Sequence, residues 1–187
     1  MALKGPTKED LGKLHSEVNQ IVNQRFILTT FAVTIFGIML AWVIPKVPPE
    51  PSSDLGWFPF LVSILTMVVL SLLFSLMHAL LIMLRIFSSY LITTESSDWE
   101  KDWLEYRKSP YFDYTKAQSV VFLVLGPLAA STPFFLKLAY NLNLAPLKGA
   151  LTTIVLAIIY VVYIYILGFN DLGSMEKASL DRWEGLK

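Results

Sequence analysis

The residues that come nearest to chemistry form a polar stripe in one apolar stretch: Ser71, Ser75, His78 and Arg85. Side chains three, four or seven positions apart lie on the same face of a helix, so all four share a face. A serine hydroxyl beside an imidazole could act as a nucleophile and its base. That chemistry also needs an oxyanion hole and a group that orients the base, and neither a glycine-rich turn nor a buried carboxylate is near. We therefore predict interhelical hydrogen bonds, or the lining of a pore, and no catalytic residue.

Composition disfavours metal, thiol and nucleic-acid chemistry. The 187 residues include no cysteine, which excludes disulfides, thiolate zinc sites and iron–sulfur clusters. The histidines are His15 and His78, and the apolar segments contain no acid, so we predict no metal site and no cofactor. The net charge is zero and the basic residues are scattered, so we expect no nucleic-acid partner.

The elements that must position the polar stripe are four apolar segments without Asp, Glu, Lys or Arg. They are residues 26–44, 55–84, 117–136 and 149–169. The chain is 55% hydrophobic and 16% charged, and a helix of about 20 apolar residues crosses the hydrocarbon core. Lipid cannot bond to peptide groups, so each segment must be helical. We predict an all-α integral membrane bundle, one four-span domain over residues 1–187 with the bilayer as its surroundings and the second span at about 57–84.

Loop charges predict which way the helices point. Lysine and arginine gather before the first span, between the second and third spans, and in the tail. The other two loops carry only Lys46, Lys137 and Lys148. Because basic residues stay on the cytoplasmic side, we expect both termini, segment 85–116 and tail 170–187 in the cytoplasm. The expected location is a plasma membrane, such as the bacterial inner membrane.

A cytosolic helix over residues 7–25 is predicted to precede the first span and to run into it without a break. Thr7 and Asp10 form an N-cap signature. Apolar residues then recur at three-four-three spacing, which is typical of a short coiled-coil seam. These residues are Leu11, Leu14, Val18 and Ile21. The seam predicts self-association.

Small side chains follow one face of the first span. They are Thr30, Thr34, Gly37 and Ala41. Small residues let helix backbones approach closely in lipid, where packing replaces the hydrophobic drive. This face is a predicted helix-packing surface.

Short interfacial helices are expected between the second and third spans and in the tail. In the first of these, Trp99, Trp103 and Tyr106 share one helical face. In a tail helix over residues 174–183, Trp183 is expected to face apolar surroundings. Aromatic faces of this kind suit the membrane surface or a partner protein.

The third span contains two prolines, Pro127 and Pro133. A proline inside a helix removes one backbone hydrogen bond, which membranes tolerate when a neighbour satisfies the freed carbonyl. We predict that this span is the hinge of the bundle.

Two functions of different classes fit these features. In the first, subunits associate through the seam and the small face into a non-enzymatic pore or permeability-controlling assembly, an effector coupled to a cytosolic sensor, with the polar stripe lining its inner half. In the alternative, the bundle is an anchor or scaffold that recruits a soluble cytosolic protein through the aromatic face. The layout resembles membrane components of bacterial antiviral systems in architecture, without a shared motif.

Overall fold

The computed structural model describes residues 7–43, 54–94, 114–140, 143–144, 147–169 and 173–185. Four of its helices are long and apolar enough to cross a membrane, which confirms the all-α four-helix bundle and supports a multi-pass membrane protein. Helix α1 spans Lys8–Val43, α2 spans Phe58–Thr93, α4 spans Tyr114–Tyr140 and α5 spans Leu147–Phe169. The short helix α6 spans Gly173–Glu184.

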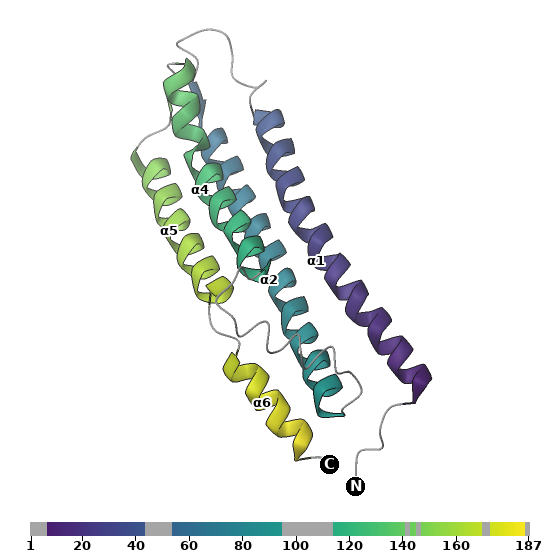
Figure 1. Cartoon of the computed structure of the whole chain (residues 1–187). Coiled ribbons are helices and arrows are strands. Elements are labelled where there is room, and N and C mark those ends of the chain that lie inside the picture. The colour runs from purple at the N-terminus through teal and green to yellow at the C-terminus, as the bar shows by residue number, and fades with distance from the viewer. Residues whose placement is uncertain are drawn as a thin grey trace.

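Helices α1 and α2 are much longer than the membrane needs. Each has 36 residues, which is about 54 Å at helical rise against about 30 Å of hydrocarbon. Both are therefore too long to lie wholly within the hydrocarbon, and charged residues such as Arg25 and Arg85 favour the end where α1 begins as the part outside it. We call this the basal end, where α1 begins, α2, α5 and α6 end, and α4 begins; the apical end is the opposite one (Figure 1).

A capping box starts α1. The backbone N–H of Asp10 donates to Thr7 Oγ1 at 3.2 Å, and the N–H of Thr7 donates to Asp10 Oδ2 at 3.0 Å. The Thr7 hydroxyl also donates to Asp10 Oδ2, at 2.6 Å. These bonds lower the pKa of the Asp10 carboxyl from its ordinary value, because they favour the charged form. The local sequence signal thus sets where the basal extension of α1 begins.

Helix α2 is the central element. It contacts α1, α4, α5 and α6, while α4 and α5 pack against each other (Figure 1). The main core cluster lies where these helices meet, around Leu70, Phe74, Phe122 and Ile164. Helices α1 and α5 leave most of their apolar surface outside the core, which suits contact with lipid.

Two short strands join the apical loops, a feature that the sequence did not suggest. Strand β1 spans Asp54–Gly56, and β2 spans Asn143–Leu144. They pair in parallel, with Asp54 opposite Asn143 and Gly56 opposite Leu144. The pairing satisfies backbone groups of both loops and links the α1–α2 connection to the α4–α5 connection.

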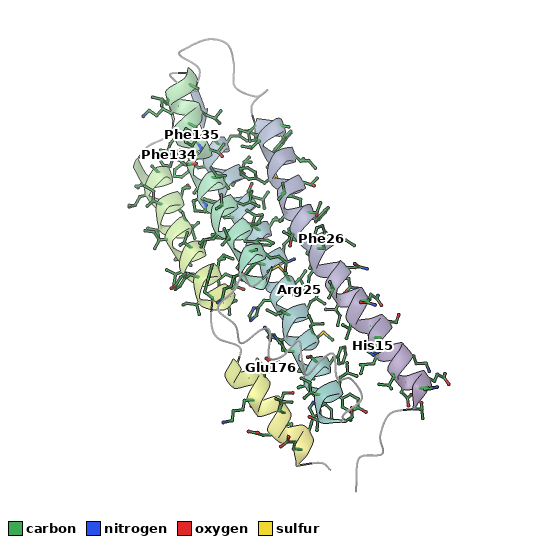
Figure 2. All side chains as sticks on the ribbon, in the orientation of Figure 1. His15, Arg25, Phe26, Phe134, Phe135 and Glu176 are labelled. Carbon is green, nitrogen blue, oxygen red and sulfur yellow. The ribbon has the colours of Figure 1, made fainter. Side chains whose placement is uncertain are left out.

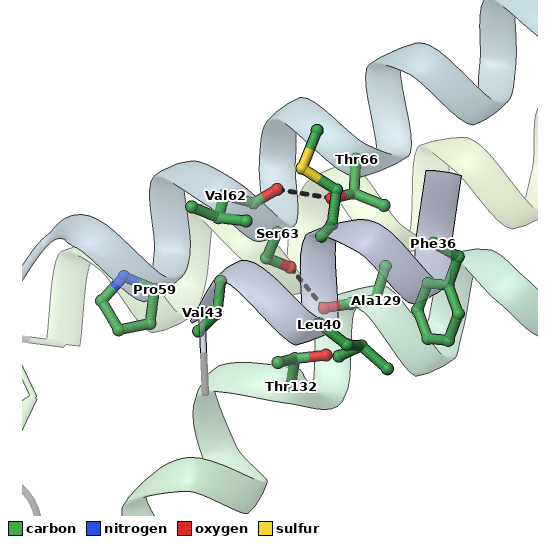
Figure 3. A pocket seen from close by; sticks show the side chains of 10 residues that line it. Phe36, Leu40, Val43, Pro59, Val62, Ser63, Thr66, Ala129 and Thr132 are labelled. Atoms are coloured by element: carbon green, nitrogen blue, oxygen red, sulfur yellow. Dashed lines mark hydrogen bonds between the residues drawn. The ribbon is translucent and has the colours of Figure 1, made fainter. Parts of the chain in front are cut away.

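The backbone carbonyl freed by Pro133 has a partner on α2. Pro133 lacks the N–H that would bond the carbonyl of Ala129, four residues earlier in α4. The Ser63 hydroxyl donates to this carbonyl at 2.6 Å (Figure 3). Both residues line a cavity of about 10 Å³ between α1, α2 and α4, close to the space that one water molecule needs. Helix α4 is continuous through both of its prolines.

Near Pro127, a tyrosine from α5 packs directly on the backbone of α4. A Cβ atom added to Gly126 would collide with the ring of Tyr160. The Tyr160 hydroxyl donates to the carbonyl of Phe122 at 2.8 Å, so the ring is held in place. Glycine is therefore required at this crossing because only a bare backbone leaves room for the ring.

The Ser63–Ala129 bond gives the first test. Ser63→Ala should lower the free energy of unfolding in detergent by about 1 kcal/mol, because it leaves a buried carbonyl unbonded. In a Pro133→Ala background the same change should cost much less, since residue 133 then supplies the missing N–H. Equal costs in both backgrounds, measured as a double-mutant cycle, would show that the hydroxyl does not compensate for the proline.

Candidate functional site at the basal end

An ion pair fixes α6 to the basal part of α2. Arg85 Nη1 donates to Glu176 Oε2 at 2.8 Å, and the two side chains are only 16% and 8% exposed. Charged groups with so little water contact must pair, because either one alone would carry a large desolvation cost. Figure 2 shows Glu176 on the side of α6 that faces the bundle.

Two further contacts continue along the same face of α6. The hydroxyls of Ser89 and Ser179 lie 2.6 Å apart, within hydrogen-bond distance. The ring of Trp183 meets that of Tyr90 edge to face, with 5.1 Å between centroids. Positions 176, 179 and 183 are three and four residues apart, so a single helical face makes all three contacts. The charged side chains of Lys177, Asp181, Arg182 and Glu184 are exposed on the rest of α6.

A second polar contact joins α1 to α4. Arg25 is only 4% exposed, and its Nη2 donates to Gln118 Oε1 at 2.6 Å. Figure 2 places Arg25 at the middle of α1, near the level at which α4 begins and α5 ends. From the sequence, Arg25 is predicted only to be one of the basic residues before the first span, and no role is predicted for Gln118. The available signal was an amide at the start of an otherwise apolar segment, since polar residues in membrane helices tend to pair.

The predicted polar stripe of α2 faces α5 and then α6. Ser75 shares a hydrogen bond of 2.6 Å with the Tyr163 hydroxyl, and it also donates to the carbonyl of Ser71. Ser71 lines a groove of about 250 Å³ between α2 and α5. His78 stacks on Phe74, and Arg85 bonds to α6 as described. The four residues therefore have separate neighbours and do not converge on one point.

The two predicted faces of α1 differ in how far the described part of the chain covers them. Ile21 is buried and Leu11, Leu14 and Val18 are half-buried, so the seam is partly covered. The small face is exposed at all four of its positions, Thr30, Thr34, Gly37 and Ala41. A Cβ atom added to Gly37 would meet nothing within 4 Å. Contact between copies through these faces stays a prediction.

The predicted aromatic face between the second and third spans cannot be compared with the structure. Trp99, Trp103 and Tyr106 lie outside the described residues. In the part of the chain that the structure describes, no three His, Asp or Glu side chains gather as metal ligands would.

Comparison of the chain with protein-family models, curated proteins and solved structures found no match. The candidate site therefore rests on geometry alone, and we place it where α6 docks on α2 through an ion pair, a hydroxyl pair and an aromatic pair.

The docking of α6 can be tested with engineered cysteines, because the chain has none of its own. Ser89→Cys with Ser179→Cys should form a disulfide on mild oxidation, since the two hydroxyls lie 2.6 Å apart. The matched control is Ser71→Cys with Ser179→Cys, because residue 71 lies about 27 Å further along α2. Mass spectrometry after thiol alkylation counts the remaining thiols. Equal oxidation of both pairs would contradict the docked position.

Proposed function

We propose that this protein is a non-enzymatic multi-pass membrane anchor that presents a helical platform to a soluble cytosolic partner. The platform consists of residues 8–25 of α1, residues 85–94 of α2, and α6. The observation that carries the proposal is the three-part docking of α6 on α2 through Arg85–Glu176, Ser89–Ser179 and Tyr90–Trp183.

Geometry supports a platform at this end. Helices α1 and α2 together extend well beyond the hydrocarbon, and α6 packs on the extended part of α2. A helix held by an ion pair, a hydroxyl pair and an aromatic pair keeps a defined outer face. That outer face carries both signs of charge, including exposed Lys177, Asp181 and Arg182. It suits a polar protein partner, for which such charges set specificity and orientation.

The proposed orientation places the platform in the cytoplasm. Basic residues gather before the first span, in segment 85–116 and in the tail. The positive-inside rule therefore favours cytoplasmic termini, and a plasma membrane such as the bacterial inner membrane.

The ion pair provides the experiment. Arg85→Glu should undock α6 by placing two carboxylates together, and loss of a buried pair typically costs about 3 kcal/mol. Most of the soluble partner recovered with the purified protein after mild cross-linking should then be lost. The charge swap, Arg85→Glu with Glu176→Arg, should restore a large part of that recovery.

The control is Glu184→Arg, which changes an exposed residue of the same helix without touching the ion pair. The proposal is wrong if no soluble protein accompanies the wild type, or if the single and the swapped variants recover it equally. Retained docking in each variant can be followed with the Ser89–Ser179 cysteine pair.

A second candidate is an oligomer that controls permeability. The exposed small face of α1 favours it, because small residues permit close packing between helices of neighbouring copies. Several copies would be needed, since the described core of one chain is filled by apolar side chains. In such an assembly the stripe that contains Ser71 and Ser75 would face the permeation path.

Planar-bilayer recordings separate the two candidates. A pore predicts ion currents that fall at least tenfold when Ser71→Leu and Ser75→Leu remove the hydroxyls. Thr152→Leu is the matched control, because Thr152 is exposed on α5 and bonds only to the backbone of its own helix. The anchor predicts no currents from any of these proteins.

A further inference from the structure

A groove opens between α4 and α5 on the side of the bundle that meets lipid. It has a volume of about 390 Å³ and is lined almost wholly by apolar side chains. Helix α4 contributes Pro127, Ala130 and Phe134, and α5 contributes Ala157, Ile158 and Val161, among others. A volume of this size is in the range that holds small molecules.

Small side chains on both helices account for the groove. Ala130 and Ser131 on α4 lie across from Ala157 on α5, so neither helix fills the space between them. Around these positions the walls consist of larger residues that are themselves exposed, such as Ile154, Ile158 and Val162. The groove is therefore open sideways to the bilayer, and an occupant would enter from the hydrocarbon.

Two lysines stand at the apical end of the same helix pair. Lys137 lies one turn beyond Phe134 in α4, and Lys148 lies less than two turns before Ile154 in α5. These separations are about 4.5 Å and about 9 Å along the helix axes. Both lysines are exposed, and within the described ranges neither forms an ion pair. Figure 2 shows Phe134 near the apical end of α4, beside the start of α5.

We propose that this groove binds one anionic phospholipid, with an acyl chain between α4 and α5 and the phosphate at Lys137 and Lys148. The apolar walls match a hydrocarbon tail, and the two positive charges match an anionic headgroup at the membrane surface. A second copy of the chain is a poorer occupant. It would have to cover two lysines that have no acidic partner among the described residues, and in lipid there is no hydrophobic drive to bring the exposed apolar walls of two copies together.

Lys137 and Lys148 also predict that the site prefers an anionic lipid to a neutral one. Each basic residue near a charged surface strengthens binding by roughly fivefold, so two give roughly 25-fold preference for an anionic lipid. The groove itself should bind the tail of a neutral lipid in the same place but more weakly. Headgroup and tail contributions can therefore be separated by different substitutions.

The experiment uses the full-length protein in vesicles of phosphatidylcholine containing a minority of phosphatidylglycerol. Native mass spectrometry after gentle extraction measures which lipid stays bound, and how many. The wild type should retain one phosphatidylglycerol. Lys137→Gln with Lys148→Gln should remove most of the roughly 25-fold preference over phosphatidylcholine, whereas Lys177→Gln on α6 should leave it unchanged.

Filling the groove tests the acyl-chain part of the site. Ala157→Phe should abolish retention of both lipids, because its ring occupies the space between α4 and α5. Val155→Phe is the matched control, since Val155 is exposed on the same helix but does not line the groove. Unfolding midpoints in detergent show whether each variant is folded. If Ala157→Phe unfolds, Ala130→Leu and Ser131→Leu provide milder fillings of the same space.

Three results would overturn the proposal. One is equal retention of the two lipids by the wild type, and another is unchanged preference in the double lysine variant. The third is a folded groove-filling variant that keeps its lipid as well as Val155→Phe does. A change of oligomer mass in that variant, with no lipid lost, would identify a second copy as the occupant and would also exclude the lipid.

Discussion

A peptide group inside a bilayer has no water to bond, and this single constraint shapes every span of the protein. Where proline removes an N–H from α4, the Ser63 hydroxyl of α2 bonds the Ala129 carbonyl that loses its donor. Elsewhere in α4, the Tyr160 hydroxyl of α5 donates to the carbonyl of Phe122, which ties these two helices together. Serine and threonine hydroxyls elsewhere, such as that of Ser71, donate to their own helix. These polar side chains thus bond either to a neighbouring helix or to their own, because lipid offers them no partner.

Helix α2 joins two environments with different rules. Within the hydrocarbon it supplies the centre of the core, where Leu70 and Phe74 are buried against α4 and α5. Beyond the hydrocarbon the same helix carries Arg85, Ser89 and Tyr90, which dock α6. A continuous helix transmits position well, so the docking surface is held in register with the membrane core. An anchor that presents a platform needs this connection, and a flexible tether after the second span would not supply it.

The candidate site was only partly visible in the sequence. Helical spacing alone placed Ser71, Ser75, His78 and Arg85 on one face, because that spacing is local. Their partners are remote: Tyr163 is 88 residues from Ser75, and Glu176 is 91 residues from Arg85. The contact between Arg25 and Gln118 spans 93 residues in the same way. A periodic pattern reports which face of a helix is polar, but not which neighbouring helix covers it.

The amino-acid sequence by itself determined that four helices are apolar enough to cross a membrane, that a capping box forms at Thr7, and that the class is all-helical. These follow from hydropathy, helical periodicity and the need to satisfy backbone groups, which act over a few residues at a time. Only the tertiary structure decided that α2 is central, that Ser63 serves the carbonyl freed by Pro133, and that Tyr160 rests on Gly126. It also decided that the small face of α1 points away from the bundle while α6 folds back on α2. Those outcomes depend on how whole helix surfaces fit together, and that fit is set by shape across distant parts of the chain.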